Sequence, residues 1–374
     1  MNVVFTCGGT GGHINPAIAV ANILKERHPN SNILFIGGKD NMEEELVPKA
    51  GYELITFPAY GIRRGKSLND IKMNIKAIRS TMYAIRKCKK IYRDFKPDVI
   101  VGTGGYASFP ALMAGAKMGI PTCVHEANAV PGLTTKMVSK KMDRVLVCFP
   151  ECKKYYDDPS KVEAVGMPVH RDFVFTRKED ARKELGLDSR PVIVTAFGSQ
   201  GAEAMNQLTA KVMRMEKDAG YPYQHIHAAG SYGWKWYKDY LRKQGVDWEE
   251  ADSLDIREYI YDMPKVMAAA DIIISRAGAA SCNEIAVSGT PCILIPSPNV
   301  TDNHQEKNAR AMVESGGAVM IRQAEATPEL VMEHITRILE DKSCYDSMVR
   351  SLQNMSVPDC AERVCDIVES LAKK

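Results

Sequence analysis

Short apolar runs, many of them β-branched, recur along the chain with amphipathic segments between them. Continuous apolar strands that alternate with helices are typical of a parallel sheet covered on both faces. The runs fall into two series, so the pattern predicts an α/β fold with two doubly wound, Rossmann-like parallel sheets. The expected strands are residues 3–5, 33–36, 99–101, 122–124 and 145–147 in the first series, and 192–196, 225–228, 272–274, 292–295 and 318–321 in the second.

The break between the two series is a candidate hinge. It consists of VGMP at residues 165–168 and the polar stretch 171–190 that follows. A chain of 374 residues also exceeds what one hydrophobic core usually supports. We therefore expect two domains, one over residues 1–165 and one over 166–357.

Three glycine-rich loops each follow an expected strand: GGTGGH at 8–13, GTGGYAS at 102–108 and FGSQGA at 197–202. Glycine has no Cβ, so such loops let a ligand or another chain segment approach the backbone closely. After the first loop, Asn15 is expected to cap a helix and Pro16 to take its first position. Because a helix start presents unpaired N–H groups and a positive dipole end, these loops are candidate phosphate cradles.

Several common cofactor sites are excluded by their motifs. A dinucleotide site needs glycine where Ile14 stands and a carboxylate at the end of the second strand, which reads FIGGK. The phosphate-binding pattern G-x-x-x-x-G-K-[ST] and D-x-D are both absent, and no His, Cys or carboxylate cluster has metal-ligand spacing. We therefore expect neither a metal site nor a bound cofactor.

The composition, 45% apolar and 25% charged, is that of a soluble globular protein. No segment has the pattern of a signal peptide or a membrane-spanning helix. These features favour a cytosolic chain that begins near Met1.

The segment 63–96 is strongly basic, with twelve Lys or Arg against two Asp, a local charge of +10 in a chain of +3. Apolar and basic positions each repeat at helical spacing, which predicts an amphipathic basic helix. Its apolar face packs on its own domain in one interpretation, and its basic stripe attracts anionic lipid in another. Nucleic acid ranks last, because no nucleic-acid-binding motif is present. The apolar positions are Leu68, Ile71, Ile75, Ile78, Met82 and Ile85; the basic ones are Lys72, Lys76, Arg79, Arg86, Lys90 and Arg93.

The most specific stretch is SRAGAASCNEIAVSGTPCILIPSP at residues 275–298. With its companion motifs, the chain resembles the peptidoglycan N-acetylglucosaminyltransferases of glycosyltransferase family 28, nearly end to end. The resemblance implies the GT-B architecture, with two Rossmann-like domains facing across a cleft. It assigns acceptor binding to 1–165 and donor binding to 166–357, and it packs a final helix, 358–374, back on the first domain. The other motifs are GGTGGH (8–13), FIGGKDNMEEELVPKAGY (35–52), GTGGY (102–106), HEANAVPGLTTK (125–136), GSQGA (198–202), DNHQEKNA (302–309) and PDCAER (358–363).

The resemblance implies a UDP-N-acetylglucosamine site in the second domain. Glu284 would accept hydrogen bonds from the ribose hydroxyls, which suits an ionised carboxylate. Ile260 would read uracil through its backbone, and Gln305 would bind sugar hydroxyls. Ser199 and two helix N-termini would hold the diphosphate. The full donor set is Arg171, Ser199, Ile260, Ala279, Ala280, Ser281, Cys282, Asn283, Glu284 and Gln305.

The first domain would bind the acceptor and supply the base. His13 ends the first glycine loop, where an imidazole that titrates near neutral pH suits proton transfer; the alternative is a structural role for its ring. Thr10, Gly11 and Gly12 would offer backbone N–H groups to the acceptor diphosphate. Asn128 would contact sugar or phosphate, with His125 and Glu126 as orienting residues.

The implied reaction is an inverting transfer of N-acetylglucosamine from the UDP sugar to the C4 hydroxyl of N-acetylmuramic acid. The acceptor is the undecaprenyl-pyrophosphoryl muramyl-pentapeptide known as lipid I, and the product is lipid II. A lipid-borne acceptor places the enzyme peripherally on the anionic cytoplasmic face of the membrane, with no nucleic-acid partner. The lipid-docking interpretation of segment 63–96 is then favoured, through Lys72, Ile75, Lys76, Arg79 and Met82.

Two positions depart from the family's motifs. His170 stands where the hinge motif has arginine, with Arg171 one residue later, and Phe197 replaces the first glycine of GGSQGA. Three alternatives stay open: a related transferase that acts on diacylglycerol, a UDP-sugar 2-epimerase, and a membrane-docked nucleotide-sugar-binding subunit without activity of its own.

Overall fold

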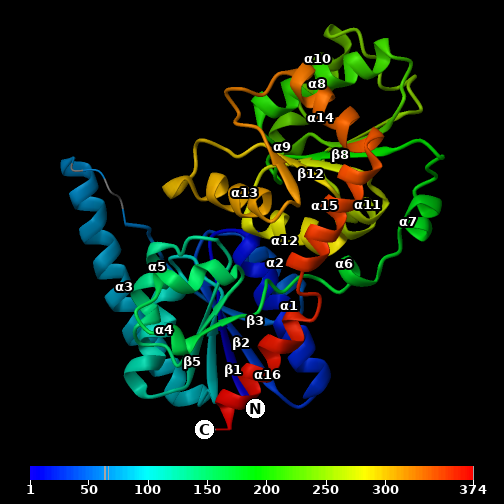
Figure 1. Cartoon of the computed structure of the whole chain (residues 1–374). Helices are drawn as coiled ribbons and strands as arrows, with labels where there is room; N and C mark the ends of the chain where they lie inside the picture. Colours follow the sequence, from blue (N-terminus) through cyan, green and yellow to red (C-terminus); the bar gives the residue numbers. More distant parts are fainter. Residues whose placement is uncertain (63–64, 66, 374) are drawn as a thin grey trace. The chain divides into compact units, whose positions relative to one another are not determined.

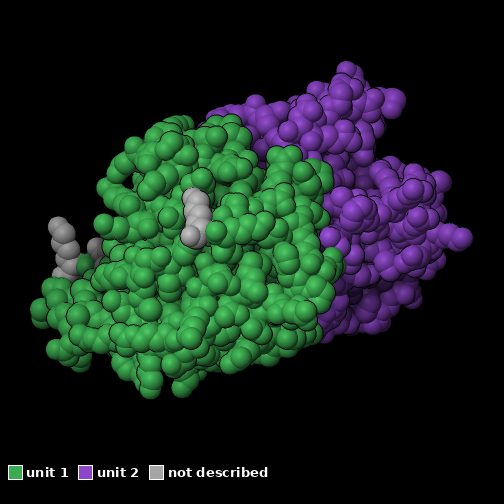
Figure 2. Space-filling model, turned by 90° about the horizontal axis from the view of Figure 1, so that it is seen from below, with its two compact units in different colours: residues 1–170, 357–374 green, residues 171–356 purple. Residues whose placement is uncertain are grey.

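The computed structural model describes residues 1–62, 65 and 67–373, which form two compact units (Figure 2). Unit 1 comprises Met1–His170 and Val357–Lys374, and unit 2 comprises Arg171–Ser356. The first crossing between the units lies five residues after the expected boundary at 165. Because the chain returns to unit 1 at Val357, unit 2 is an insertion within unit 1.

Unit 1 is built on a seven-stranded parallel sheet, sheet A, in the order β3-β2-β1-β4-β5-β6-β7 (Figure 1). The order reverses between β1 and β4, which is where ligands of doubly wound sheets bind. The strands are β1 (Asn2–Thr6), β2 (Asn32–Gly38), β3 (Glu53–Phe57), β4 (Val99–Gly102), β5 (Thr122–Glu126), β6 (Arg144–Val147) and β7 (Val162–Ala164). The helices are α1 (Gly11–Arg27), α2 (Glu43–Lys49), α3 (Leu68–Phe95), α4 (Ser108–Met118), α5 (Leu133–Ser139), η1 (Pro150–Tyr155), η2 (Pro159–Lys161) and α16 (Cys360–Ala372).

Unit 2 contains a six-stranded parallel sheet, sheet B, in the order β10-β9-β8-β11-β12-β13. Its order reverses between β8 and β11. The strands are β8 (Val192–Ala196), β9 (Gln224–Ala228), β10 (Leu254–Arg257), β11 (Ile272–Ser275), β12 (Cys292–Leu294) and β13 (Ala318–Met320). The helices are α6 (Asp172–Phe175), α7 (Lys178–Glu184), α8 (Glu203–Asp218), α9 (Gly230–Gly233), α10 (Tyr237–Lys243), α11 (Met263–Ala269), α12 (Ala279–Ser288), η3 (Thr301–Asn303), α13 (His304–Glu314), α14 (Pro328–Glu340) and α15 (Lys342–Met355).

All ten expected strands are present, and the three strands that the pattern did not predict, β3, β7 and β10, lie at sheet edges. An edge strand pairs on one side only and needs no continuous apolar run. Its burial is accordingly incomplete or alternating, as in the LDIR sequence of β10. The apolar-run criterion therefore found every strand inside the sheets and missed three of the four edge strands, since it predicted only β13 among them.

The final helix, α16, packs against α1 in unit 1. Val364, Val368 and Leu371 are buried in the same core as Ala17 and Val20 of α1. Unit 1 therefore draws its core from both ends of the chain.

Helix α1 begins earlier than the sequence pattern predicted. Its cap is Thr10 and its first residue is Gly11, so the expectation of an Asn15 cap with Pro16 at the first position is wrong. Two glycines and His13 adopt the helical conformation, and Pro16 lies inside the helix at the cost of one hydrogen bond to the backbone. The earlier start turns the glycine loop itself into the helix N-terminus.

Helix α3 exposes the apolar stripe that one interpretation had packed on its own domain. It packs against α4 through a seam whose buried residues are Ala77, Ala84, Cys88 and Tyr92. The packed-stripe interpretation is therefore wrong for the first half of the helix. Arg63, Arg64 and Lys66 of the expected basic segment lie outside the described residues. The exposed apolar residues are Leu68 (87%), Ile71, Ile75, Ile78 (54%) and Met82 (49%), beside the exposed Lys72, Lys76 and Arg79.

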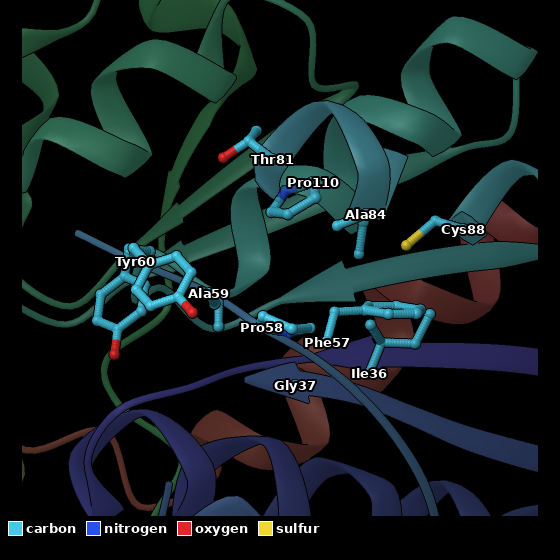
Figure 3. A pocket seen from close by; sticks show the side chains of 13 residues that line it. Ile36, Gly37, Phe57, Pro58, Ala59, Tyr60, Thr81, Ala84, Cys88 and Pro110 are labelled. Carbon is cyan, nitrogen blue, oxygen red and sulfur yellow. The ribbon is translucent and has the colours of Figure 1, made fainter. Parts of the chain in front are cut away.

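A small pocket lies where α3 passes the ends of β2 and β3, and most of the residues that line it are apolar (Figure 3). Ala84 and Cys88 of α3 face Phe57 and the loop after β3 across it, and Tyr106 and Ala107 line it from the second glycine loop. Ala84 and Cys88 of α3 therefore border this pocket, while the large apolar residues in the first half of the helix are exposed.

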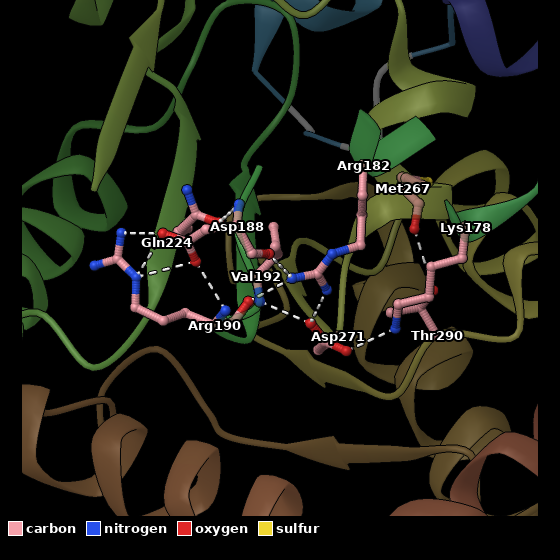
Figure 4. A network of polar contacts seen from close by, with 9 residues as sticks. All are labelled: Lys178, Arg182, Asp188, Arg190, Val192, Gln224, Met267, Asp271 and Thr290. Carbon is pink, nitrogen blue, oxygen red and sulfur yellow. Dashed lines mark hydrogen bonds and ion pairs between the residues drawn. The ribbon is translucent and has the colours of Figure 1, made fainter. Parts of the chain in front are cut away.

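The amino edge of sheet B is tied together by paired charges (Figure 4). Asp271, which precedes β11, lies 2.6 Å from Lys178 Nζ and 3.0 Å from an Arg182 guanidinium nitrogen, both on α7. The same carboxylate accepts the Val192 N–H at 2.7 Å. This network joins α7 to β8 and β11, the two strands at the switch point of unit 2.

Candidate functional site

His13 is held in one tautomer at the carboxyl edge of sheet A. Its Nδ1 lies 2.9 Å from the Thr103 carbonyl oxygen, while the Thr103 hydroxyl donates to the His13 carbonyl at 2.5 Å. A carbonyl can only accept, so Nδ1 carries the hydrogen and Nε2 of the neutral ring carries the lone pair. The half-buried ring is thus arranged as a proton acceptor at Nε2.

The second glycine loop is shaped around this ring and around the first loop. Gly104 has φ +95°, and a Cβ there would lie 2.9 Å from His13 Nδ1. A Cβ at Gly105 would lie 2.3 Å from the Gly8 carbonyl oxygen. Backbone of the two loops therefore meets where side chains would not fit, which explains the glycines physically.

His125, at the end of β5, is buried and lies near His13. Its Nε2 donates to the Gly166 carbonyl at 2.7 Å, and burial together with the nearby His13 lowers the pKa of His125. A neutral buried ring of this kind orients its surroundings rather than exchanging protons with solvent.

Thr10, Gly11 and Gly12 lie at the N-terminus of α1. The first backbone bonds of the helix run from His13 N and Ile14 N to the Thr10 carbonyl. The N–H groups before them lie in the part of a helix where no intrahelical acceptor exists. This end of α1 therefore has the donor arrangement that an anion requires.

Glu43, in the first turn of α2, was not singled out from the sequence. It is fully buried, and its carboxylate accepts the Gly38 N–H at 2.7 Å and the Gly9 N–H at 3.2 Å. Glu43 thus clamps the first glycine loop to the end of β2. Only its place in the motif FIGGKDNMEEELVPKAGY could have indicated it, because Gly9 lies 34 residues away.

Glu126 holds the loop that carries Asn128. One of its oxygens accepts both the backbone and the side-chain N–H of Asn128 at 3.0 Å, and the other accepts the Gly132 N–H at 3.0 Å. Glu126 is buried and Asn128 is half-buried. Glu126 therefore orients Asn128.

The third glycine loop lies at the carboxyl edge of sheet B, between β8 and α8. Gly198 and Gly201 have φ values of +96° and +77°, and a Cβ at Gly201 would lie 2.1 Å from the Ala229 carbonyl oxygen. Ser199 is exposed between them, and its carbonyl accepts the Ser231 N–H at 3.2 Å. The loop is fixed by backbone contacts, and the Ser199 side chain faces solvent.

Helix α12 begins at the carboxyl end of β11, beside this loop in sheet order. Ala279, Ala280 and Ser281 are its first three residues, so their N–H groups lack intrahelical acceptors. Cys282 does not fit the expected binding role: its thiol is fully buried in the core and its N–H donates to the Gly278 carbonyl at 2.9 Å. The N–H groups without an intrahelical acceptor at this helix start therefore end at Ser281.

Glu284 is half-buried on α12, and burial raises its pKa from an ordinary 4.5 to about 7. Its charge also contributes to the raised pKa of Tyr259, so the two residues are neighbours. Ile260 follows Tyr259, with its side chain 2% exposed in the core. The backbone at Ile260 and the carboxylate of Glu284 are thus brought to one region of unit 2.

Three further residues of the expected donor set lie on α12 or on neighbouring segments of unit 2. Gln305, on α13, accepts the Ser297 N–H at 2.8 Å through Oε1, so its Nε2 carries the donors that a sugar hydroxyl would accept. Asn283 turns its amide onto its own helix, donating to the Ala279 carbonyl at 2.8 Å. Arg171 is exposed just before α6, which packs against α12.

Solved structures share this fold. Acinetobacter baumannii MurG matches with a TM-score of 0.75 at 24% identity over 99% of each chain. A UDP-GlcNAc 2-epimerase from Neisseria meningitidis, bound to UDP-GlcNAc, matches with a TM-score of 0.68 at 16% identity over 100% of each chain. At these identities the likeness establishes the fold: two parallel-sheet α/β domains of the GT-B type.

The chain belongs to glycosyltransferase family 28. Residues 3–147 match the N-terminal domain of that family and residues 192–364 match its C-terminal domain. A protein of Acetivibrio thermocellus, called UDP-N-acetylglucosamine--N-acetylmuramyl-(pentapeptide) pyrophosphoryl-undecaprenol N-acetylglucosamine transferase, is 38% identical over 375 residues, which are 100% of this chain and 99% of that protein.

Proposed function

We propose that this chain transfers N-acetylglucosamine from UDP-N-acetylglucosamine to the C4 hydroxyl of the muramyl sugar in undecaprenyl-pyrophosphoryl-MurNAc-pentapeptide. The full-length similarity to a transferase of that name supports the choice of substrates. The single observation that carries the chemistry is the tautomer of His13, whose Nδ1–H bond to Thr103 leaves Nε2 as the proton acceptor.

In this proposal unit 1 binds the acceptor and supplies the base. His13 Nε2 takes the proton of the attacking hydroxyl, which then displaces UDP from the anomeric carbon with inversion. The N–H groups of Thr10, Gly11 and Gly12 bind the acceptor diphosphate at the start of α1. Asn128, held by Glu126, contacts the acceptor from the neighbouring loop.

Unit 2 binds the donor. Glu284 accepts the ribose hydroxyls, the Ile260 backbone reads uracil, and Gln305 binds the sugar. Ser199 and the starts of α8 and α12 hold the diphosphate, where oriented N–H groups stabilise the charge that develops as UDP leaves. Arg171 adds a positive charge beside α12.

We further propose that the first half of α3 docks on an anionic membrane surface. Its exposed apolar stripe from Leu68 to Met82 would enter the headgroup region, and Lys72, Lys76 and Arg79 would contact lipid phosphates. In the described part of the chain, no helix has the length and apolarity needed to span a bilayer. Docking would bring the protein to a lipid-borne acceptor on the cytoplasmic face.

Transfer can be tested directly with radiolabelled UDP-N-acetylglucosamine and a synthetic lipid I analogue, with and without divalent metal. We expect label in the lipid product and no isomerised sugar when the acceptor is omitted. If label appears in UDP-N-acetylmannosamine when the acceptor is omitted, the protein is a 2-epimerase. If UDP-N-acetylglucosamine binds and no sugar is transferred, the protein is a non-enzymatic subunit.

Docking can be tested with vesicles that contain anionic phosphatidylglycerol. Each basic residue near such a surface contributes about 1 kcal/mol, and the new carboxylates add repulsion, so the triple variant Lys72→Glu, Lys76→Glu, Arg79→Glu should bind at least about a hundredfold more weakly. Its UDP affinity should not change. A matched control reverses Arg86, Lys90 and Arg93 within residues 84–95 of α3, where no large apolar side chain is exposed. Equal losses in both triple variants would contradict a docking site in the first half.

A further inference from the structure

A chain of polar side chains lies buried on the α8 face of sheet B, and the proposed reaction does not use it. Glu216 of α8 is 1% exposed, and its oxygens lie 3.0 and 3.1 Å from His225 Nδ1. His225 Nε2 lies 2.9 Å from the Thr195 hydroxyl, which lies 2.7 Å from His227 Nδ1. Both histidines are 0% exposed. We call Glu216, His225, Thr195 and His227 the buried polar chain.

The Thr195 hydroxyl is the centre of this chain. A carboxylate only accepts, so His225 Nδ1 carries a hydrogen toward Glu216. The hydroxyl has one hydrogen, so it donates to one imidazole and accepts from the other. Burial lowers the pKa of His227 far below its ordinary value, which keeps that ring neutral. Loss of the hydroxyl would therefore break two buried hydrogen bonds at once.

The far end of the buried polar chain touches the third glycine loop. The His227 ring has two aromatic neighbours, with centroid distances of 6.5 Å to Phe197 and 4.6 Å to Tyr237. Phe197 is buried and is the first residue of the loop, at the position where the family's motif has glycine. The loop also packs against the end of β9, the strand of His227, where the Ala229 carbonyl contacts Gly201.

We propose that the buried polar chain positions the donor's diphosphate loop. It fixes the His227 ring, and that ring, through Phe197, holds Ser199 and the start of α8 in the geometry that binds the diphosphate. None of its four members touches substrate, so each is a positioning residue. The inference rests on the proposed function, because it takes the loop at residues 197–202 to be the diphosphate site.

The test compares ligands with and without a diphosphate. In Thr195→Val the side chain keeps its shape and loses the hydroxyl, and calorimetric titration should show UDP binding about five- to tenfold more weakly, because two buried bonds are lost. Uridine binding should not change, since uracil and ribose are bound elsewhere. The KM of Thr195→Val for UDP-N-acetylglucosamine should rise by about the same factor as its dissociation constant for UDP. Thr195→Ser, which keeps the hydroxyl, should restore both values to those of the wild type.

Thr290→Val is the matched control. Thr290 is also a buried threonine of unit 2, 5% exposed, and its hydroxyl donates to the Met267 carbonyl at 3.2 Å (Figure 4). This variant should lose stability as Thr195→Val does, with an unchanged ratio of UDP to uridine affinity. Phe197→Ala leaves the four polar groups intact and cuts their link to the loop, so it should shift the ratio even if Thr195→Val fails to fold.

Two outcomes separate this inference from the proposed function. Equal weakening of UDP and uridine in Thr195→Val, or an unchanged ratio in both Thr195→Val and Phe197→Ala, would overturn the positioning role. Failure of the wild-type protein to bind UDP at all would instead overturn the proposed function.

Discussion

The carboxyl edges of the two sheets are braced in opposite ways. In sheet A, the buried carboxylates of Glu43 and Glu126 accept backbone N–H groups of the loops they hold. In sheet B, the fully buried amides of Asn206 and Asn308 donate to backbone carbonyls, of Ala229 at 2.7 Å and Ala277 at 3.2 Å.

The difference matters because each buried side chain that holds a loop occupies one kind of backbone group, either N–H or carbonyl. We call such a side chain an acceptor brace or a donor brace. An acceptor brace removes N–H groups from the loop and adds negative charge behind it. That environment suits a hydroxyl nucleophile and its imidazole base. A donor brace removes carbonyls and leaves N–H groups for a diphosphate. We infer that the edge of unit 1 combines an imidazole base with the anion-binding start of α1, whereas the edge of unit 2 is arranged for anion binding alone.

His13→Ala should have the largest effect and separates the roles of the two edges most clearly. Loss of a general base lowers kcat by about 10²- to 10⁴-fold. The affinity for UDP should stay at the wild-type value, because the donor groups belong to unit 2. Steady-state transfer rates and calorimetric titration with UDP would measure the two effects. A kcat within a few-fold of wild type would leave His13 with only a structural role.

Glu284→Gln should have the next largest effect, on donor affinity. Charged hydrogen bonds to the ribose are lost, so UDP should bind about 10- to 100-fold more weakly. In the wild type, UDP affinity should rise between about pH 6 and pH 8, because the carboxyl, with a pKa of about 7, ionises over that range. A UDP affinity that does not vary with pH would contradict the role of the ionised form.

The same raised pKa has a stability consequence of opposite sign. Ionisation of Glu284 is harder in the folded chain than in the unfolded one, so its contribution lowers the free energy of unfolding as pH rises through about 7. Glu284→Gln removes that cost. The melting temperature of the variant should therefore exceed that of the wild type by a margin that grows from about pH 4.5 to about pH 7 and stays constant above that.

The smallest expected effects come from inverting the braces. In Glu43→Gln, an NH₂ group takes the place of one carboxylate oxygen and faces the N–H of Gly38 or Gly9. In Asn206→Asp, a carboxylate oxygen takes the place of the NH₂ group and faces the Ala229 carbonyl. Each should cost about 1–3 kcal/mol of unfolding free energy, since one buried partner is lost. Glu43→Gln should raise KM for the lipid acceptor only, and Asn206→Asp that for the donor only. If both variants changed the KM for the same substrate, the assignment of acceptor binding to unit 1 and donor binding to unit 2 would be contradicted.

The strands inside both sheets could be predicted from the sequence, because burial on two faces demands unbroken apolar runs. The glycine loops and His13 were also visible, since they are contiguous in the chain. Glu43 was not, because its partners Gly9 and Gly38 meet it only through the fold. The packing face of α3 was misjudged for a related reason. Periodicity detects the stripe of large apolar residues, whereas the buried seam is formed by the small residues Ala77, Ala84 and Cys88 together with Tyr92.

Because unit 2 is inserted within unit 1, the two units can complete their folding at different times during synthesis. Unit 2 is one uninterrupted stretch of sequence, so all of its core is available once Ser356 has been made. Sheet A, although synthesised first, waits for Val364, Val368 and Leu371 to cover α1. A ribosome that stalls before these last turns leaves the half that holds His13 with an uncovered apolar face, and the segment translated in the middle is the first to be complete.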